Sequence, residues 1–178
     1  MSLIHEETIR KEVLRKVAEK MLAAARTAPK ARGVDNLILA IAEKDEIELI
    51  AKKMKEMFQK GEGPDFFIRD SENILKSEFV VLLGTKISPV GLEHCGFCGF
   101  RNCEEKNKNP AKPCAFNTGD LGIAIGSAVS VAMDERIDNR VMYSVGLAAR
   151  ELKLLGSEAQ IVYGIPLSIS CKNPYFDR

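Results

Sequence analysis

Four of the chain's five cysteines lie within twenty residues, and this clustering constrains the fold more than any other feature. They are Cys95, Cys98, Cys103 and Cys114, in the run HCGFCGFRNCEEKNKNPAKPC, whereas Cys171 is far away in the sequence. The C-x2-C step lets two neighbouring sulfurs share one metal centre, and the third and fourth cysteines can reach round it. The sequence therefore predicts a cysteine-rich loop over residues 93–116 that binds a metal or a cluster.

Three kinds of site are compatible with these cysteines, and an iron-sulfur cluster agrees best with the spacing. Structural zinc loops usually combine C-x2-C with a second close pair, whereas here the later steps have four and ten intervening residues. Four cysteines without a long separation favour [4Fe-4S] over [2Fe-2S]. Structural zinc is the first alternative, and redox-active thiols or disulfides are the second.

The residues between the cysteines suit a cluster. Gly96 and Gly99 each follow a cysteine, where they allow a tight turn and let backbone amides point at sulfur. Phe97 and Phe100 are expected to limit solvent access, and His94 is expected to be an exposed neighbour of the first cysteine. Four basic residues are available to offset the negative charge of the thiolates: Arg101, Lys106, Lys108 and Lys112.

The composition is that of one soluble domain spanning residues 1–178. The chain is 46% hydrophobic and 29% charged, and 26 Lys and Arg balance 25 Asp and Glu. A net charge of +1 provides no broad field for nucleic acid or for an anionic membrane. The first twenty residues do not resemble a secretory signal, and the longest apolar stretch, Leu121 to Met133, is too short to span a bilayer. We expect a reducing cytoplasm, where clustered cysteines favour metal over disulfides.

Hydrophobic patterning predicts helices interleaved with a few buried strands. Helices are expected at about Thr8 to Arg26, Glu43 to Lys60, Asp70 to Lys76, Asp120 to Asp134 and Asn139 to Leu155. Strands are expected at Asn36 to Ala42, Glu78 to Gly84 and Gln160 to Leu167. This order indicates an α+β fold, an α/β sandwich in which helices cover a small mixed sheet and the cysteine loop is an insertion.

Two motifs carry a resemblance to iron-sulfur proteins. The run CGFCGFRNC resembles the C-G-x-C-G-x-x-x-C opening of four-iron domains in corrinoid iron-sulfur proteins and in electron-transport complex subunits, although Cys114 follows sooner than the fourth cysteine of those domains. The runs PCAFNTGDLGIAIGSAVSVA and KNPYFDR resemble an uncharacterised bacterial and archaeal family described as containing a ferredoxin domain. The resemblance implies Cys95, Cys98, Cys103 and Cys114 as cluster ligands.

A second resemblance concerns the scaffold. The segments AARTAPKARGVDNL and DLGIAIGSAVSVAM resemble parts of the flavin-dependent nitroreductases, which are homodimers with FMN bound between subunits. The chain lacks the Arg-rich segment that holds the FMN phosphate in that family. Three basic residues are the candidates for this role, Arg26, Lys30 and Arg32, with solvated helix ends as the alternative. No catalytic residue is identified.

These observations predict an iron-sulfur redox protein that transfers electrons, either within an FMN-dependent oxidoreductase or to a redox partner protein or small-molecule acceptor. Gly122 and Gly126 lie four residues apart on one expected helix, which suggests close helix packing and a homodimer. The alternative is a non-enzymatic metalloprotein in which zinc or a sensing cluster holds the loop.

Overall fold

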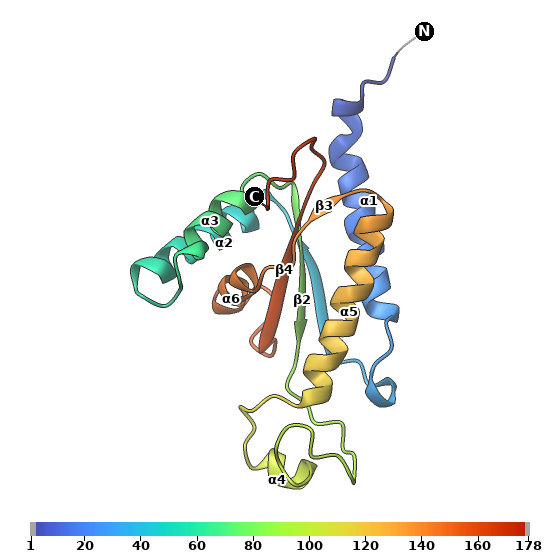
Figure 1. Cartoon of the computed structure of the whole chain (residues 1–178), viewed down its shortest axis with the longest axis vertical. Coiled ribbons are helices and arrows are strands. Elements are labelled where there is room, and N and C mark those ends of the chain that lie inside the picture. Colours follow the sequence, from blue (N-terminus) through green and yellow to red (C-terminus); the bar gives the residue numbers. More distant parts are fainter. Residues whose placement is uncertain (1–2, 177–178) are drawn as a thin grey trace.

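The computed structural model describes residues 3–176, and its centre is a four-stranded sheet with helices on both faces (Figure 1). The strands are β1 (Leu37–Ala42), β2 (Phe79–Thr85), β3 (Asp138–Asn139) and β4 (Ile161–Ser168), in the order β1-β2-β4-β3. Every pairing between these strands is antiparallel. The α+β fold is therefore confirmed, with an antiparallel sheet in place of the mixed one.

The side chains of β2 point alternately to the two faces of the sheet, and helices cover both faces. Phe79, Val81 and Leu83 pack with α1 (Glu6–Thr27) and α5 (Ala115–Asp134). Val80 and Leu82 face the other way and pack with α2 (Lys44–Gln59), α3 (Phe66–Ile74) and α6 (Tyr143–Glu151). Because successive side chains of a strand point to opposite faces, a strand buried on both sides reads as a continuous apolar run.

The elements with the strongest patterns match their predicted ranges to within a few residues, namely α1, β1, α2, β2 and β4. Three other helices differ from their predicted ranges. Helix α3 begins before the predicted Asp70, α5 begins before the predicted Asp120, and α6 covers only the middle of its predicted range. The sequence did not predict β3 or the short helix α4 (Cys103–Asn107). Among residues 3–176, no helix is long and apolar enough to cross a membrane.

The cysteine loop occupies one end of the molecule. Residues 86–114 connect the end of β2 to the start of α5 and include α4, which lies below the sheet in Figure 1. Thr85, the last residue of β2, pairs with Ile161, the first residue of β4. The chain after β4 therefore leaves from the opposite end of the sheet, where Phe79 pairs with Leu167. The sheet thus separates the loop from the C-terminal segment.

Candidate functional site

All four clustered cysteines line one small cavity inside the loop. Cys114 is 5% exposed, while Cys95, Cys98 and Cys103 are partly buried. All four are free thiols. Within residues 3–176, no three thiol, imidazole or carboxylate side chains are close enough together to bind a single metal ion. The structure thus brings the predicted ligands around a common space without drawing them to one point.

The first two cysteines are held by a glycine turn. Gly96 and Gly99 have φ values of 74° and 83°, in the left-handed region that glycine adopts without a steric penalty. The Gly99 amide donates a hydrogen bond to the Gly96 carbonyl at 2.9 Å, which closes the turn around Cys98. The predicted tight turn is therefore present. The Gly99 amide donates its hydrogen bond within this turn.

Helix α4 positions the third cysteine. Asn102 is its N-cap, and the Asn102 side chain accepts a hydrogen bond from the Glu105 amide at 2.9 Å. The Glu105 carboxylate in turn accepts from the Arg101 amide at 2.7 Å. These two contacts resemble a capping box, in which the N-cap and N3 side chains satisfy free amides at the helix start. Cys103 is consequently fixed as the first residue of α4.

Cys114 lies at the N-terminus of a long helix. It is the N-cap residue of α5, and its carbonyl accepts a hydrogen bond from the Thr118 amide at 3.3 Å. Cys114 is consequently fixed at the junction between the loop and α5. The predicted helix start at Asp120 was too late to reveal this.

The rest of the cavity wall is mainly apolar, with contributions from Pro89, Val90, Leu92, Ala115 and Phe116. Phe97 is 77% exposed, yet its ring stacks on Phe116 with a centroid separation of 5.8 Å. Phe97 itself does not line the cavity, so the expectation that it limits solvent access stays a prediction. One cation, Lys106, also lines the cavity and is only 2% exposed.

Several hydrogen bonds tie the start of the loop, and the turn that precedes β1, to the scaffold. Arg32 lies in the turn η1 (Ala31–Gly33) and donates to the carbonyls of Val90 at 3.0 Å and Gly91 at 3.3 Å. Asn117 of α5 accepts from the Ser88 amide at 2.8 Å. Asp120 is buried and accepts from the Ala31 amide, so it joins η1 to α5 instead of starting the helix.

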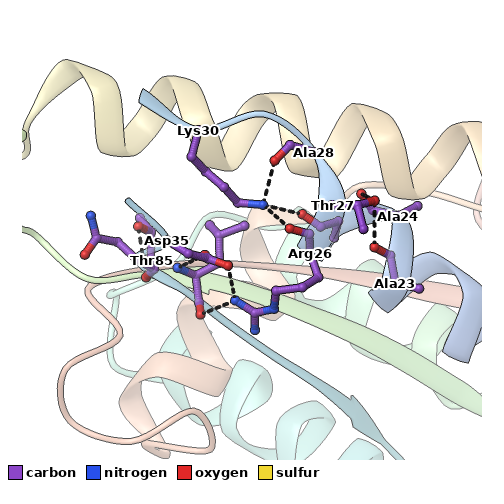
Figure 2. Close-up of polar contacts among 11 residues, drawn as sticks. Ala23, Ala24, Arg26, Thr27, Ala28, Lys30, Asp35 and Thr85 are labelled. Carbon is purple, nitrogen blue, oxygen red and sulfur yellow. Dashed lines mark hydrogen bonds and ion pairs between the residues drawn. The ribbon is translucent and has the colours of Figure 1, made fainter. Parts of the chain in front are cut away.

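The other two residues predicted to contact a flavin phosphate also have partners within the chain (Figure 2). The Lys30 ammonium donates to the carbonyls of Ala25, Arg26 and Ala28, at 2.9, 2.5 and 2.7 Å, and so satisfies the C-terminal end of α1. Arg26 pairs with Asp35 at 2.6 Å. Burial raises the pKa of Asp35, but hydrogen bonds from Arg26 and the Leu37 amide outweigh it, so the pKa lies below its ordinary value.

His94 and Cys171 both lie outside the cavity. His94 is exposed and does not line the cavity, as expected for a neighbour of the first cysteine. Cys171 is exposed and follows the far end of β4, away from the cysteine loop. Neither residue is positioned to replace one of the four clustered thiols.

The phosphate contacts of Arg26, Lys30 and Arg32 stay a prediction.

The fold is similar to that of solved nitroreductase-like flavoproteins. A nitroreductase family protein from Clostridium novyi NT superposes with a TM-score of 0.62 at 18% identity, covering 92% of this chain and 77% of that one. An oxidoreductase containing FMN superposes with a TM-score of 0.59 at 14% identity, covering 89% and 68%. An FMN-dependent nitroreductase from Clostridium difficile R20291 gives 0.54 at 14% identity, covering 89% and 77%. At these identities the likeness shows the fold.

Sequence comparison gives a closer relationship. An uncharacterized protein from Archaeoglobus fulgidus is 41% identical over 183 residues, which cover 99% of this chain and 97% of the relative. Residues 111–178 match the family described as uncharacterized proteins containing a ferredoxin domain. The matched segment begins just before Cys114 and includes α5 and the C-terminal half of the sheet. The chain therefore belongs to this family of proteins that contain a ferredoxin domain.

Proposed function

We propose that the protein is an electron-transfer protein in which Cys95, Cys98, Cys103 and Cys114 hold a [4Fe-4S] cluster. The observation that supports this most directly is the convergence of all four thiols on one cavity. When bound, such a cluster supplies one-electron redox chemistry. The apolar wall around the thiols limits water, and the start of α5 fixes Cys114 at the cavity. The electrons would pass to a redox partner protein or a small-molecule acceptor.

The spacing of the cysteines supports a cluster over zinc. Structural zinc loops usually combine C-x2-C with a second close pair, whereas here the later steps have four and ten intervening residues. A four-iron cluster takes one thiolate at each iron.

A flavin enzyme is the second candidate, because the fold resembles FMN-containing oxidoreductases. In that case the cluster would exchange electrons with FMN within one protein. Arg26, Lys30 and Arg32 are the candidates for the phosphate, although each is engaged within this chain and would have to exchange its partner. The fold similarity alone does not establish an activity.

The metal, sulfide and flavin contents of protein purified without oxygen test these proposals together. We expect about four irons and four acid-labile sulfides per chain, with a broad absorption band near 400 nm. Flavin in the same preparation would favour the oxidoreductase. One zinc without sulfide would contradict the cluster and make the loop a structural site. Loss of folding in Cys98→Ser without a redox change would support the same structural alternative.

We also propose that the protein is a homodimer that pairs through α5. The exposed positions of this helix before Asp134 carry no charge, in a chain that is 29% charged: Thr118, Gly119, Gly122, Ile123, Gly126, Ser130 and Met133. Apart from the backbone of the helix itself and the adjacent residues, no heavy atom of residues 3–176 lies within 4 Å of a Cβ added to any of the three glycines. A smooth, uncharged helix face of this kind allows a second helix to approach closely.

The substitution Ile123→Glu is expected to convert the dimer to a monomer, because it places a charge within this face. The matched control is Leu49→Glu on α2, since Leu49 is 51% exposed and Ile123 is 49% exposed. Sedimentation at micromolar concentration would show a dimer for wild type and for the control. A wild-type monomer, or a dimer that survives Ile123→Glu, would contradict pairing through α5.

We propose that the protein works in a reducing compartment such as the cytoplasm, because the four cysteines of the loop must be reduced to bind a cluster.

A further inference from the structure

Lys106 differs from the other basic residues of the cysteine loop. Arg101, Lys108 and Lys112 are exposed, whereas Lys106 is 2% exposed and lines the cavity together with the four cysteines. Among residues 3–176, no acidic side chain forms an ion pair with Lys106, and its Nζ is not one of the fully buried nitrogens that lack a partner. The alkyl chain is therefore covered while the ammonium lies at the edge of the buried region, as is usual for lysine. A source of negative charge in the cavity would give this lysine a partner.

The four thiolates of a bound cluster are such a source. Four thiolate ligands leave a net negative charge on an iron-sulfur site, and the apolar wall strengthens its interaction with a nearby cation. Helix α4 holds Lys106 in place, because Cys103 and Lys106 are three residues apart and so share one helix face. The cap at Asn102 fixes both residues in relation to the cavity.

We propose that Lys106 is a positioning residue that balances the charge of the four thiolate ligands and raises the reduction potential of the site. This inference rests on the proposed cluster. Each electron delivered by a one-electron donor leaves the site one unit more negative. A buried cation stabilises that reduced state more than the oxidised one, so it makes reduction easier. An exposed cation is screened by water and has a smaller effect.

The test compares Lys106→Met with Lys106→Arg and with Lys108→Met, all purified without oxygen. Methionine removes the charge while keeping an unbranched side chain, arginine keeps the charge, and Lys108 is an exposed control on the same segment. Dithionite serves as the electron donor, and the visible absorption reports the ratio of reduced to oxidised cluster at each potential. Iron and sulfide are measured in every preparation.

In Lys106→Met we expect the ratio of reduced to oxidised cluster at the wild-type midpoint potential to be at least tenfold lower than in wild type. This corresponds to a midpoint potential that is lower by about 59 mV for one electron. Lys106→Arg and Lys108→Met are expected to stay within about threefold of wild type. Loss of iron in Lys106→Met with retention in Lys106→Arg would also support the charge-balancing role.

Two results would overturn the proposal in different ways. A fully loaded Lys106→Met with the wild-type potential, or equal loss of the cluster in both Lys106 variants, would refute the role of the charge and leave the cluster itself intact as a proposal. Wild-type protein that contains no iron and no sulfide would overturn the cluster and the role of Lys106 together.

Discussion

Replacement of Cys114 by serine is expected to reduce the iron content from about four to three or fewer per chain and to remove most of the visible absorption. Cys114 lines the cavity and is 5% exposed, so its thiol faces the site rather than solvent. Serine is a favourable N-cap residue, and the start of α5 should therefore be preserved. The measurement is iron, sulfide and absorption on protein purified without oxygen.

The matched control for this experiment is Cys171→Ser. Cys171 is the remaining cysteine, and it is exposed in the segment after the far end of β4. We expect its substitution to leave the metal content unchanged. Thermal unfolding of the metal-free variants should match that of wild type, which would show that the helix is intact. Four irons retained in Cys114→Ser would exclude this residue as a ligand.

The elements that could be predicted from sequence are those whose patterns do not depend on distant partners. The run at Glu78 to Gly84 is apolar almost throughout because β2 is covered on both faces, and this signal places it to within one residue. Helices α1 and α2 have long amphipathic repeats. In contrast, β3 consists of Asp138 and Asn139, and it exists because these residues pair with Ser168 and Leu167. Long-range pairing of two polar residues leaves no local pattern.

Asp120 shows how a correct local rule gave a wrong boundary. Aspartate before an apolar run is a common N-cap, and the sequence therefore predicted a helix start there. In the structure Asp120 lies within α5 and accepts hydrogen bonds from the Ala31 amide. Its role is a tertiary contact with a segment 89 residues away. The true start at Ala115 follows the N-cap residue Cys114, and cysteine is not one of the residues favoured at that position.

The cysteines of the site could be predicted from sequence, whereas the special position of Lys106 could not. Spacing identifies the thiols because a short C-x2-C step is typical of a metal or cluster site. The basic residues near them have the same chemistry, and only the formation of α4 buries Lys106. A signal for α4 was present, since Asn102 and Glu105 have the separation of a capping box.

The same limitation applies to the basic residues after α1. The sequence makes Lys30 and Arg32, and secondarily Arg26, candidates to bind a phosphate, but each has a different partner in the fold. Lys30 caps carbonyls at the end of α1, Arg26 pairs with Asp35, and Arg32 reaches the cysteine loop. Arg32 also has a φ of 56°, a left-handed conformation that no sequence pattern at this position indicates. Charge type alone does not show which internal contact a side chain makes.

The position of α6 against β4 depends on two glycines, Gly146 and Gly164. A Cβ atom on Gly146 of α6 would lie 1.8 Å from the Val162 carbonyl oxygen. A Cβ atom on Gly164 of β4 would lie 2.2 Å from a methyl group of Val145. Real Cβ atoms do not approach backbone atoms so closely, and the helix and strand would have to separate.

Gly146→Ala is therefore expected to lower the free energy of unfolding by about 3 kcal/mol or more, because overpacking against backbone cannot be relieved by a rotamer change. The control is Glu48→Ala on α2, an exposed helix position outside the proposed dimer face. Alanine is the better helix former, so this control should change stability by no more than about 1 kcal/mol. Urea unfolding of the metal-free, reduced proteins measures both values. Equal unfolding midpoints for Gly146→Ala and wild type would show that α6 and β4 are not in such close contact.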